Sequence, residues 1–196
     1  RAIEQPGFRG TYVTTTRKEA RERAWTSDTQ SGLLDVLRQY GTSVDHPSCE
    51  VQLLGGIRAE VRDQVMSVDF SNGSQITMFG FDAERAMRKQ RGLAKHLYWI
   101  DEAQDIRFLD SFYDKVVMAA LSDYAGECWL SGTPGRDCVG MFYECTKDDE
   151  TDGPLLAGWE THSIAVVDNP FFGNVIGDDS AGWLQYFVVD NMKELT

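Results

Sequence analysis

The sequence predicts an α/β domain with a mainly parallel sheet flanked by helices. Short apolar segments alternate along the chain with segments rich in helix-forming residues, which is the pattern of a parallel-sheet fold. Two apolar segments, residues 97–100 and 128–130, have no polar face, as expected for strands covered on both sides. Asn72-Gly73 between two alternating segments adds one antiparallel hairpin near residues 65–80.

The expected elements follow from local residue preferences. Thr16 is a suitable cap for the first helix, Asp82 for the third, and glycines end several helices. The expected helices cover residues 17–25, 33–40, 83–90, 108–124 and 139–146. The expected strands cover residues 11–16, 65–70, 76–79, 97–100, 128–130 and 159–167. The region around Pro47 and Gly55-Gly56 is predicted to be a loop of uncertain structure.

The composition is that of a globular domain. The chain has 196 residues, of which 42% are apolar and 11% aromatic, enough to bury one core. No apolar run approaches the roughly 20 residues that span a bilayer, and the first residues lack the apolar stretch of a signal peptide. The four cysteines form no C-x-x-C pair and the three histidines are scattered, which argues against a structural zinc site.

The charge is unevenly distributed. The formal net charge is −12, the wrong sign for a protein whose whole surface binds nucleic acid. Two segments are nevertheless basic: Arg17, Lys18, Arg21 and Arg23, and then Arg85, Arg88, Lys89, Arg91 and Lys95. Solvated helix faces are the favoured explanation of such clusters, and a binding surface is the alternative.

Two adjacent carboxylates, Asp101 and Glu102, directly follow the apolar segment 97–100. In a parallel α/β sheet, ligands bind beyond the carboxyl ends of the strands. Carboxylates at that position commonly hold a magnesium ion with a phosphate, the arrangement called Walker B in nucleotide hydrolases. The alternative is a strand that ends in a solvated acidic turn.

Two further motifs flank this carboxylate pair. Arg91-Gly92 precedes the strand, and Ser131-Gly-Thr133 ends the next buried strand. We expect all three motifs at one edge of the sheet, because the ends of adjacent parallel strands meet there. Carboxylates for magnesium and water, hydroxyls near the γ-phosphate and an arginine that neutralises charge together form a site for phosphoryl transfer.

These motifs resemble those of the ATPase domain of the large terminase subunit of tailed bacteriophages. The resemblance spans residues 11–172, and residues 173–196 are left as a linker or packing extension. Its motifs are Thr14-Thr-Thr-Arg17, Phe70-Ser-Asn-Gly-Ser74, Arg91-Gly92, Tyr98-Trp-Ile-Asp-Glu-Ala103, Ser131-Gly-Thr-Pro-Gly135 with Phe142-Tyr143, and Asp168-Asn-Pro170. Their order and spacing are more specific than any single motif.

The resemblance implies a RecA-like P-loop ATPase core of the ASCE type, with ATP and Mg²⁺ as cofactors. Asp101 matches the aspartate that holds magnesium, directly or through water. Glu102 matches the catalytic carboxylate, and Arg91 matches an arginine finger that acts on a neighbouring subunit. Ser131, Gly132 and Thr133 match the ATP-contacting motif that couples hydrolysis to movement.

The same resemblance implies the biological setting. The implied activity is ATP-driven packaging of double-stranded DNA into a procapsid by a homo-oligomeric ring. The implied partners are the portal protein and the small terminase subunit, in the cytoplasm of the host cell and without a membrane.

One part of the family pattern is absent from the sequence. No G-x-x-x-x-G-K-[ST] motif is present. The family places this phosphate-binding loop before the strand at 11–16, so we expect it upstream of Arg1 in a longer protein, and little ATP turnover by this chain alone. The family's nuclease domain is also missing. A DEAD-like helicase or other nucleic-acid-dependent ATPase core, and a catalytically inactive structural remnant of one, are the alternatives.

Overall fold

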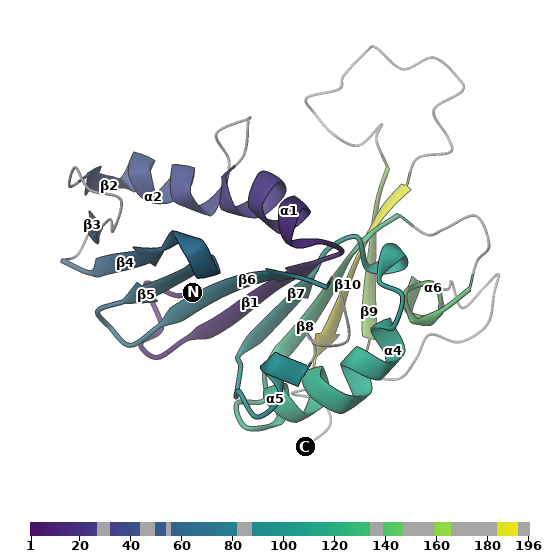
Figure 1. Ribbon diagram of the computed structural model, residues 1–196. Coiled ribbons are helices and arrows are strands. Elements are labelled where there is room, and N and C mark those ends of the chain that lie inside the picture. Colours follow the sequence, from purple (N-terminus) through teal and green to yellow (C-terminus); the bar gives the residue numbers. More distant parts are fainter. Residues whose placement is uncertain are drawn as a thin grey trace, which may run out of the picture.

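The computed structural model describes residues 1–26, 32–43, 50–53, 56–81, 88–133, 139–146, 159–165 and 184–191. These residues form one sheet with helices on both faces (Figure 1). The strands are β1 (Arg9–Thr14), β2 (Gly41–Ser43), β3 (Glu50–Leu53), β4 (Arg58–Arg62), β5 (Ser67–Phe70), β6 (Gln75–Gly80), β7 (Leu97–Ile100), β8 (Glu127–Gly132), β9 (Trp159–Ala165) and β10 (Leu184–Asn191).

The strand order is β2-β3-β4-β5-β6-β1-β7-β8-β10-β9. The four central strands, β6, β1, β7 and β8, are parallel to one another. Antiparallel strands extend the sheet on either side of them. The predicted α/β class is therefore confirmed, and the parallel part is the centre of the sheet.

The helices lie on both faces of this sheet. The segments are α1 (Arg17–Glu19) with a π-helical continuation (Ala20–Trp25), α2 (Leu33–Tyr40), α4 (Leu109–Phe112) with a π-helical turn (Tyr113–Val117) and α5 (Met118–Ser122), and α6 (Met141–Thr146). Figure 1 shows α1 and α2 on one side of the sheet and α4, α5 and α6 on the other. All of them fall within the predicted helices; most of the predicted helix at 83–90 lies outside the described residues.

The hairpin predicted from Asn72-Gly73 is confirmed. β5 and β6 pair in antiparallel fashion, and the amide of Phe70 donates to the carbonyl of Ser74 at 2.9 Å. Gly73 has φ 83°, a left-handed conformation that glycine adopts without steric cost.

The sequence did not indicate three strands between α2 and the hairpin. β2, β3 and β4 occupy the region predicted to be a loop. β4 alternates between exposed charged residues and the buried Ala59 and Val61. Glutamate and alanine have low strand propensity, so pairing with β5 rather than local preference determines this strand. Within the segment 173–196, β10 pairs with β8.

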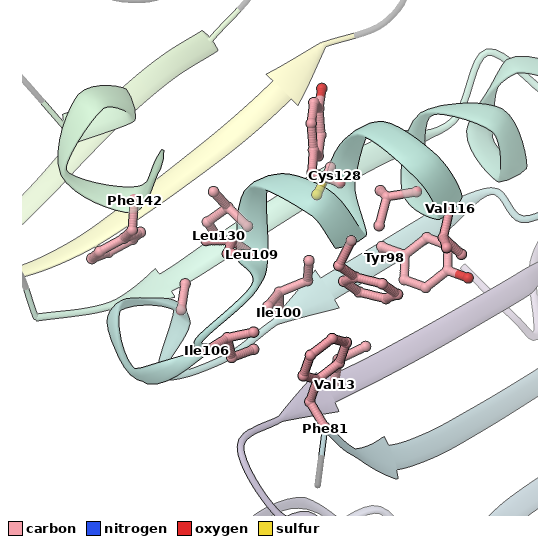
Figure 2. Packing of buried hydrophobic residues seen from close by; sticks show 14 of the residues in the cluster. Val13, Phe81, Tyr98, Ile100, Ile106, Leu109, Val116, Cys128, Leu130 and Phe142 are labelled. Carbon is pink, nitrogen blue, oxygen red and sulfur yellow. The ribbon is translucent and has the colours of Figure 1, made fainter. Parts of the chain in front are cut away.

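Side chains of the central strands alternate between two cores. Val13, Tyr98, Ile100, Cys128 and Leu130 point toward α4 and α5 and are fully buried in the first core (Figure 2). The intervening residues along β1 and β7 point to the other face, where the second core packs under α1 and α2. The carboxyl ends of β1, β7 and β8 lie beside one another at one edge of this sheet, because the three strands are parallel.

The first helix is held tightly against the end of the sheet. Thr16 and Glu19 form a capping box, in which the Glu19 amide donates to Thr16 Oγ1 at 3.1 Å. A Cβ atom at Gly80, the last residue of β6, would overlap with the backbone nitrogen of Arg17. Glycine at position 80 therefore allows the helix that leads to Arg23 to start next to the sheet.

The side chains of Cys128 and Cys145 are fully buried. Among the helices described here, none combines the length and apolar character needed to cross a bilayer.

We expect Phe112→Ala to lower the free energy of unfolding by about 3–5 kcal/mol, because it removes a large side chain from the first core. Phe112 is 0% exposed and its ring lies 5.0 Å from that of Phe81 and 5.9 Å from that of Tyr98. The matched control is Phe108→Ala in the turn before α4. Phe108 is 49% exposed, so its loss should cost about 1 kcal/mol or less. Urea denaturation checks both values, and equal losses would contradict the described packing.

Candidate functional site

The carboxyl ends of β1, β7 and β8 meet at one edge of the sheet. Val13 of β1 is in register with Ile100 of β7, and Ile100 with Leu130 of β8. The amide of Asp101 donates to the carbonyl of Val13 at 2.8 Å and extends the pairing by one step. Asp101 therefore leaves the sheet directly beside Ser131, the next residue of β8.

The carboxylate of Asp101 connects three strands. Its Oδ2 accepts a hydrogen bond from the hydroxyl of Tyr12 at 2.7 Å, and its Oδ1 accepts one from Ser131 Oγ at 2.7 Å. The indole nitrogen of Trp99 donates to the same Ser131 Oγ at 2.8 Å. Both carboxylate oxygens are thus oriented by side chains of the neighbouring strands.

Tyr12 keeps its proton in this arrangement. Burial, together with the adjacent Asp101 carboxylate, raises the pKa of the Tyr12 phenol far above its usual range. The phenol is therefore a fixed donor at any physiological pH. Because the phenol stays neutral, it donates a hydrogen bond to Asp101 and adds no second negative charge beside it.

Glu102 has an unusual backbone conformation. Its φ is 51° in the left-handed region, which few residues other than glycine adopt. The residues after it form a 3₁₀ turn, Ala103–Asp105, and the side chains of Ala103 and Ile106 are buried in the first core. The anchored turn holds Glu102 in a conformation that costs about 1–3 kcal/mol; such residues cluster at functional sites.

The carboxylate of Glu102 has two partners. Arg23, on the π-helical turn after α1, forms an ion pair and hydrogen bond with Oε1. The side-chain amide of Gln104 donates to Oε2 at 2.7 Å. Partial burial raises the pKa of Glu102, but the Gln104 hydrogen bond and the Arg23 charge outweigh this effect, so the net pKa is lowered. Glu102 is ionised at neutral pH.

Gln104 links the motif that carries the carboxylates to the motif that carries the hydroxyls. Its Oε1 accepts a hydrogen bond from the backbone amide of Thr133 at 3.2 Å, while its Nε2 holds Glu102. A Cβ atom at Gly132 would overlap with Gln104 Oε1. Glycine at position 132 therefore leaves the space that the carboxamide occupies.

A cavity of about 410 Å³ opens beside this edge. Asp101 and Arg23 form its charged part, and aromatic and aliphatic side chains of the second face, among them Tyr12 and Trp99, form most of the rest. The aspartate is therefore reachable from the cavity as well as hydrogen-bonded within the protein.

The donor set suits one class of metal ion. Within the described parts of the chain, no three His, Cys, Asp or Glu side chains gather into a group that could hold a metal. Asp101, Glu102 and Ser131 offer only oxygen atoms, the ligands that Mg²⁺ prefers. Magnesium is commonly bound by one or two carboxylates together with substrate phosphates, so these residues fit a magnesium ion that arrives with a phosphorylated ligand.

The structure brings most of the predicted residues together. Asp101, Glu102, Ser131, Gly132 and Thr133 lie at one edge and are connected directly or through Gln104.

Arg91 is placed differently from the expectation that it shares this edge. It lies on an exposed turn that leads into the amino-terminal end of β7. Between this turn and the strand, the backbone amides of Lys95 and His96 donate hydrogen bonds to the carbonyls of Ala120 and Arg9. None of the side-chain hydrogen bonds described above for Asp101 and Glu102 involves Arg91.

Sequence reasoning missed three residues of the site. Gln104 lies two residues after Glu102, so the motif Asp-Glu-Ala-Gln contained a signal for it. The alternation of side chains along β1 was the available signal for Tyr12. In the structure its ring packs edge-on against that of Trp99. Arg23 is 79 residues from Glu102, and only the tertiary structure reveals their pairing.

Comparisons with known proteins add structural neighbours. No protein-family model matches the chain. No curated protein matches it either. An arginine-to-alanine mutant of the large terminase ATPase domain of Thermus phage P74-26 has a TM-score of 0.50 at 15% identity, over 74% of this chain and 54% of that one.

Two further structures are similar at lower scores. Another structure of the same P74-26 domain has a TM-score of 0.49 at 13% identity, over 72% of this chain and 53% of that one. The large terminase of a second, thermophilic bacteriophage has a TM-score of 0.46 at 14% identity, over 68% of this chain and 28% of that one. The chain spans about half the length of the ATPase-domain chains that it matches. At this identity the similarity shows the fold alone: the chain has an α/β fold similar to that of a phage large terminase ATPase domain.

Proposed function

We propose that this chain is part of the ATP-hydrolysing subunit of a motor that packages double-stranded viral DNA, and that the edge described above is the hydrolytic half of its ATP site. The observation that carries the proposal is the presence of two oriented carboxylates at the end of β7: Asp101 accepts a hydrogen bond from Ser131 of β8, and Glu102 accepts one from Gln104. The terminase ATPase fold supports it.

Asp101 and Ser131 are the proposed ligands of a magnesium ion bound with ATP, directly or through water. Magnesium bridges phosphate oxygens and neutralises the charge that develops on them. Tyr12 and Trp99 orient these two side chains before any ligand arrives, so little reorganisation is needed on binding.

Glu102 is the proposed catalytic carboxylate. Phosphoryl transfer asks the protein mainly to position a water and to stabilise charge. Each oxygen of an ionised carboxylate has two lone pairs, so Glu102 can accept a hydrogen bond from water while it keeps Arg23 and Gln104. Arg23 supplies a positive charge at the same edge and helps to keep Glu102 ionised.

Gln104 is the proposed link between hydrolysis and movement. It joins the carboxylate of Glu102 to the backbone of Thr133, the end of the motif that the resemblance assigns to coupling. A displacement of Thr133 would pull on the carboxamide and so reorient Glu102. Through this connection the motif on β8 can sense and change the state of the catalytic carboxylate.

The wider setting belongs to the same proposal. Double-stranded DNA is the proposed cargo, in a ring of identical subunits that works with a portal protein and a small terminase subunit in the host cytoplasm. Arg91 remains the proposed arginine finger for a neighbouring subunit, and its exposure on a turn is compatible with that role. The phosphate-binding loop would come from a segment of the longer protein.

Glu102→Gln should lower kcat for ATP about 10²–10⁴-fold in the longer protein that contains this chain, because the carboxylate that orients water is lost. The affinity for ATP should stay nearly unchanged. Steady-state kinetics with a nucleotide-binding assay measure both. The control is Glu22→Gln, at an exposed position on the π-helical continuation of α1, where turnover should be normal. Normal turnover in Glu102→Gln as well would remove Glu102 from its role.

Gln104→Leu should lower kcat on the order of 10²-fold with little change in KM, because Glu102 is then misplaced rather than absent. The pKa of Glu102 should rise in the same variant, since it loses the amide donor. A purely structural role for Gln104 would instead lower the melting temperature and leave that pKa unchanged.

Arg23→Met should raise the pKa of Glu102, because the guanidinium that stabilises its anion is gone. The pKa of Glu102 is lower in the folded state than its ordinary value of 4.5. The ion pair with Arg23 therefore stabilises the fold fully at a pH above 4.5, and this stabilisation is lost as the pH falls through the lowered pKa. NMR titration of ¹³C-labelled glutamate carboxyls measures the shift. Arg38→Met, on α2 and paired with Asp35, is the control; the same Glu102 titration in Arg23→Met and wild type would refute the pairing.

A further inference from the structure

Lys95 is a buried lysine outside the site at the end of β7. The residue is 2% exposed, and its backbone amide donates to the carbonyl of Ala120 at 2.7 Å, which fixes its position just before β7. Among the described residues, the charge that acts on its ammonium group is that of Arg9, which is also positive. Burial beside a like charge disfavours an ammonium ion, so a lysine at this position calls for an explanation.

The side chain of Lys95 lines a groove of about 540 Å³ that runs along β6. Among the described residues that line the groove and the cavity beside Asp101, only Met78 is shared. The polar lining of the groove includes Ser67, Gln75 and Thr77, and the apolar lining of the groove includes Met66, Phe79 and Leu93. Low-dielectric walls of this kind strengthen electrostatic attraction to a bound ion.

All charged residues among the described lining of the groove are positive. Arg17 and Lys89 join Lys95, and no aspartate or glutamate is among them. Arg17 donates to the carbonyl of Gln64, the residue before Val65 in the groove lining. Burial and the nearby charge of Arg9 lower the pKa of Lys95 to about 8, so the amine is still mostly protonated at neutral pH.

We propose that this groove binds a phosphate group, with the ammonium of Lys95 as its anchor and Arg17 and Lys89 as additional cations. A phosphate would supply a negative charge beside the ammonium, and the hydroxyl of Ser67 would donate to one of its oxygens. Free phosphate and the backbone of a nucleic-acid strand share this chemistry. The proposal does not rest on the ATPase role of Asp101 and Glu102.

The test is thermal unfolding of the chain with inorganic phosphate, against sodium chloride at equal ionic strength. A ligand that binds only the folded state raises the melting temperature by roughly 3–6 °C at about ten times its Kd. Wild type and the control Lys18→Met, whose lysine is 80% exposed, should show this rise. Lys95→Met should lose it. An equal rise in Lys95→Met, or an equal rise with chloride, overturns the proposal.

A second measurement covers the case in which Lys95→Met changes the fold. In wild-type protein with ¹⁵N-labelled lysine, phosphate should shift the Nζ resonance of Lys95 and raise its pKa, because the anion favours the charged amine. An unchanged resonance at saturating phosphate overturns the proposal.

The source of the phosphate group is identified by the same assays with a short single-stranded oligonucleotide without terminal phosphates. If the oligonucleotide raises the melting temperature in a Lys95-dependent manner at a lower concentration of phosphate groups than inorganic phosphate requires, the ligand is a nucleic-acid strand. If only inorganic phosphate raises the melting temperature, the ligand is the free anion. Normal phosphate binding by Glu102→Gln keeps this result separate from the ATPase proposal.

Discussion

The carboxylate of Asp101 is the interaction on which the rest of the candidate site depends. It follows β7 and accepts hydrogen bonds from Tyr12 of β1 and Ser131 of β8, so one side chain connects three adjacent parallel strands. Parallel strands end at the same edge of a sheet, and this geometry brings both hydroxyls within 2.7 Å of the carboxylate. Residues of these same three strands belong to the first core.

Glu102 is arranged by a different kind of constraint. The buried Ala103 and Ile106 force the chain to turn immediately after Asp101, and Glu102 adopts a left-handed conformation as a consequence. Its carboxylate then lies between Arg23 and Gln104. One carboxylate is thus oriented by the strands and the other by a helix and a turn. That separation suits two adjacent residues with different tasks, one holding a metal with phosphates and one acting on water.

The sequence predicted the parts of this structure that local patterns determine. The apolar segments at 97–100 and 128–130, the hairpin turn and the cap at Thr16 were all readable, and strand-end logic placed Asp101 next to Ser131. The arginine that contacts Glu102 could not be predicted from such local patterns. Arg91 is close to Glu102 in the sequence, but the residue that contacts it is Arg23, which is 79 positions away in the sequence. β2, β3 and β4 were also missed, because their pairing with neighbouring strands, rather than residue preference, makes them strands.

The most direct test of the central claim is the position of a metal ion in the longer protein bound to a non-hydrolysable ATP analogue and Mn²⁺. Manganese occupies magnesium sites and gives an anomalous diffraction signal. We expect a peak either about 2.1 Å from an oxygen of Asp101 or about 4 Å away with one water between them. The γ-phosphate should lie on the side of the metal that faces Glu102. A nucleotide-bound structure whose metal peak lies away from the end of β7 would contradict the account.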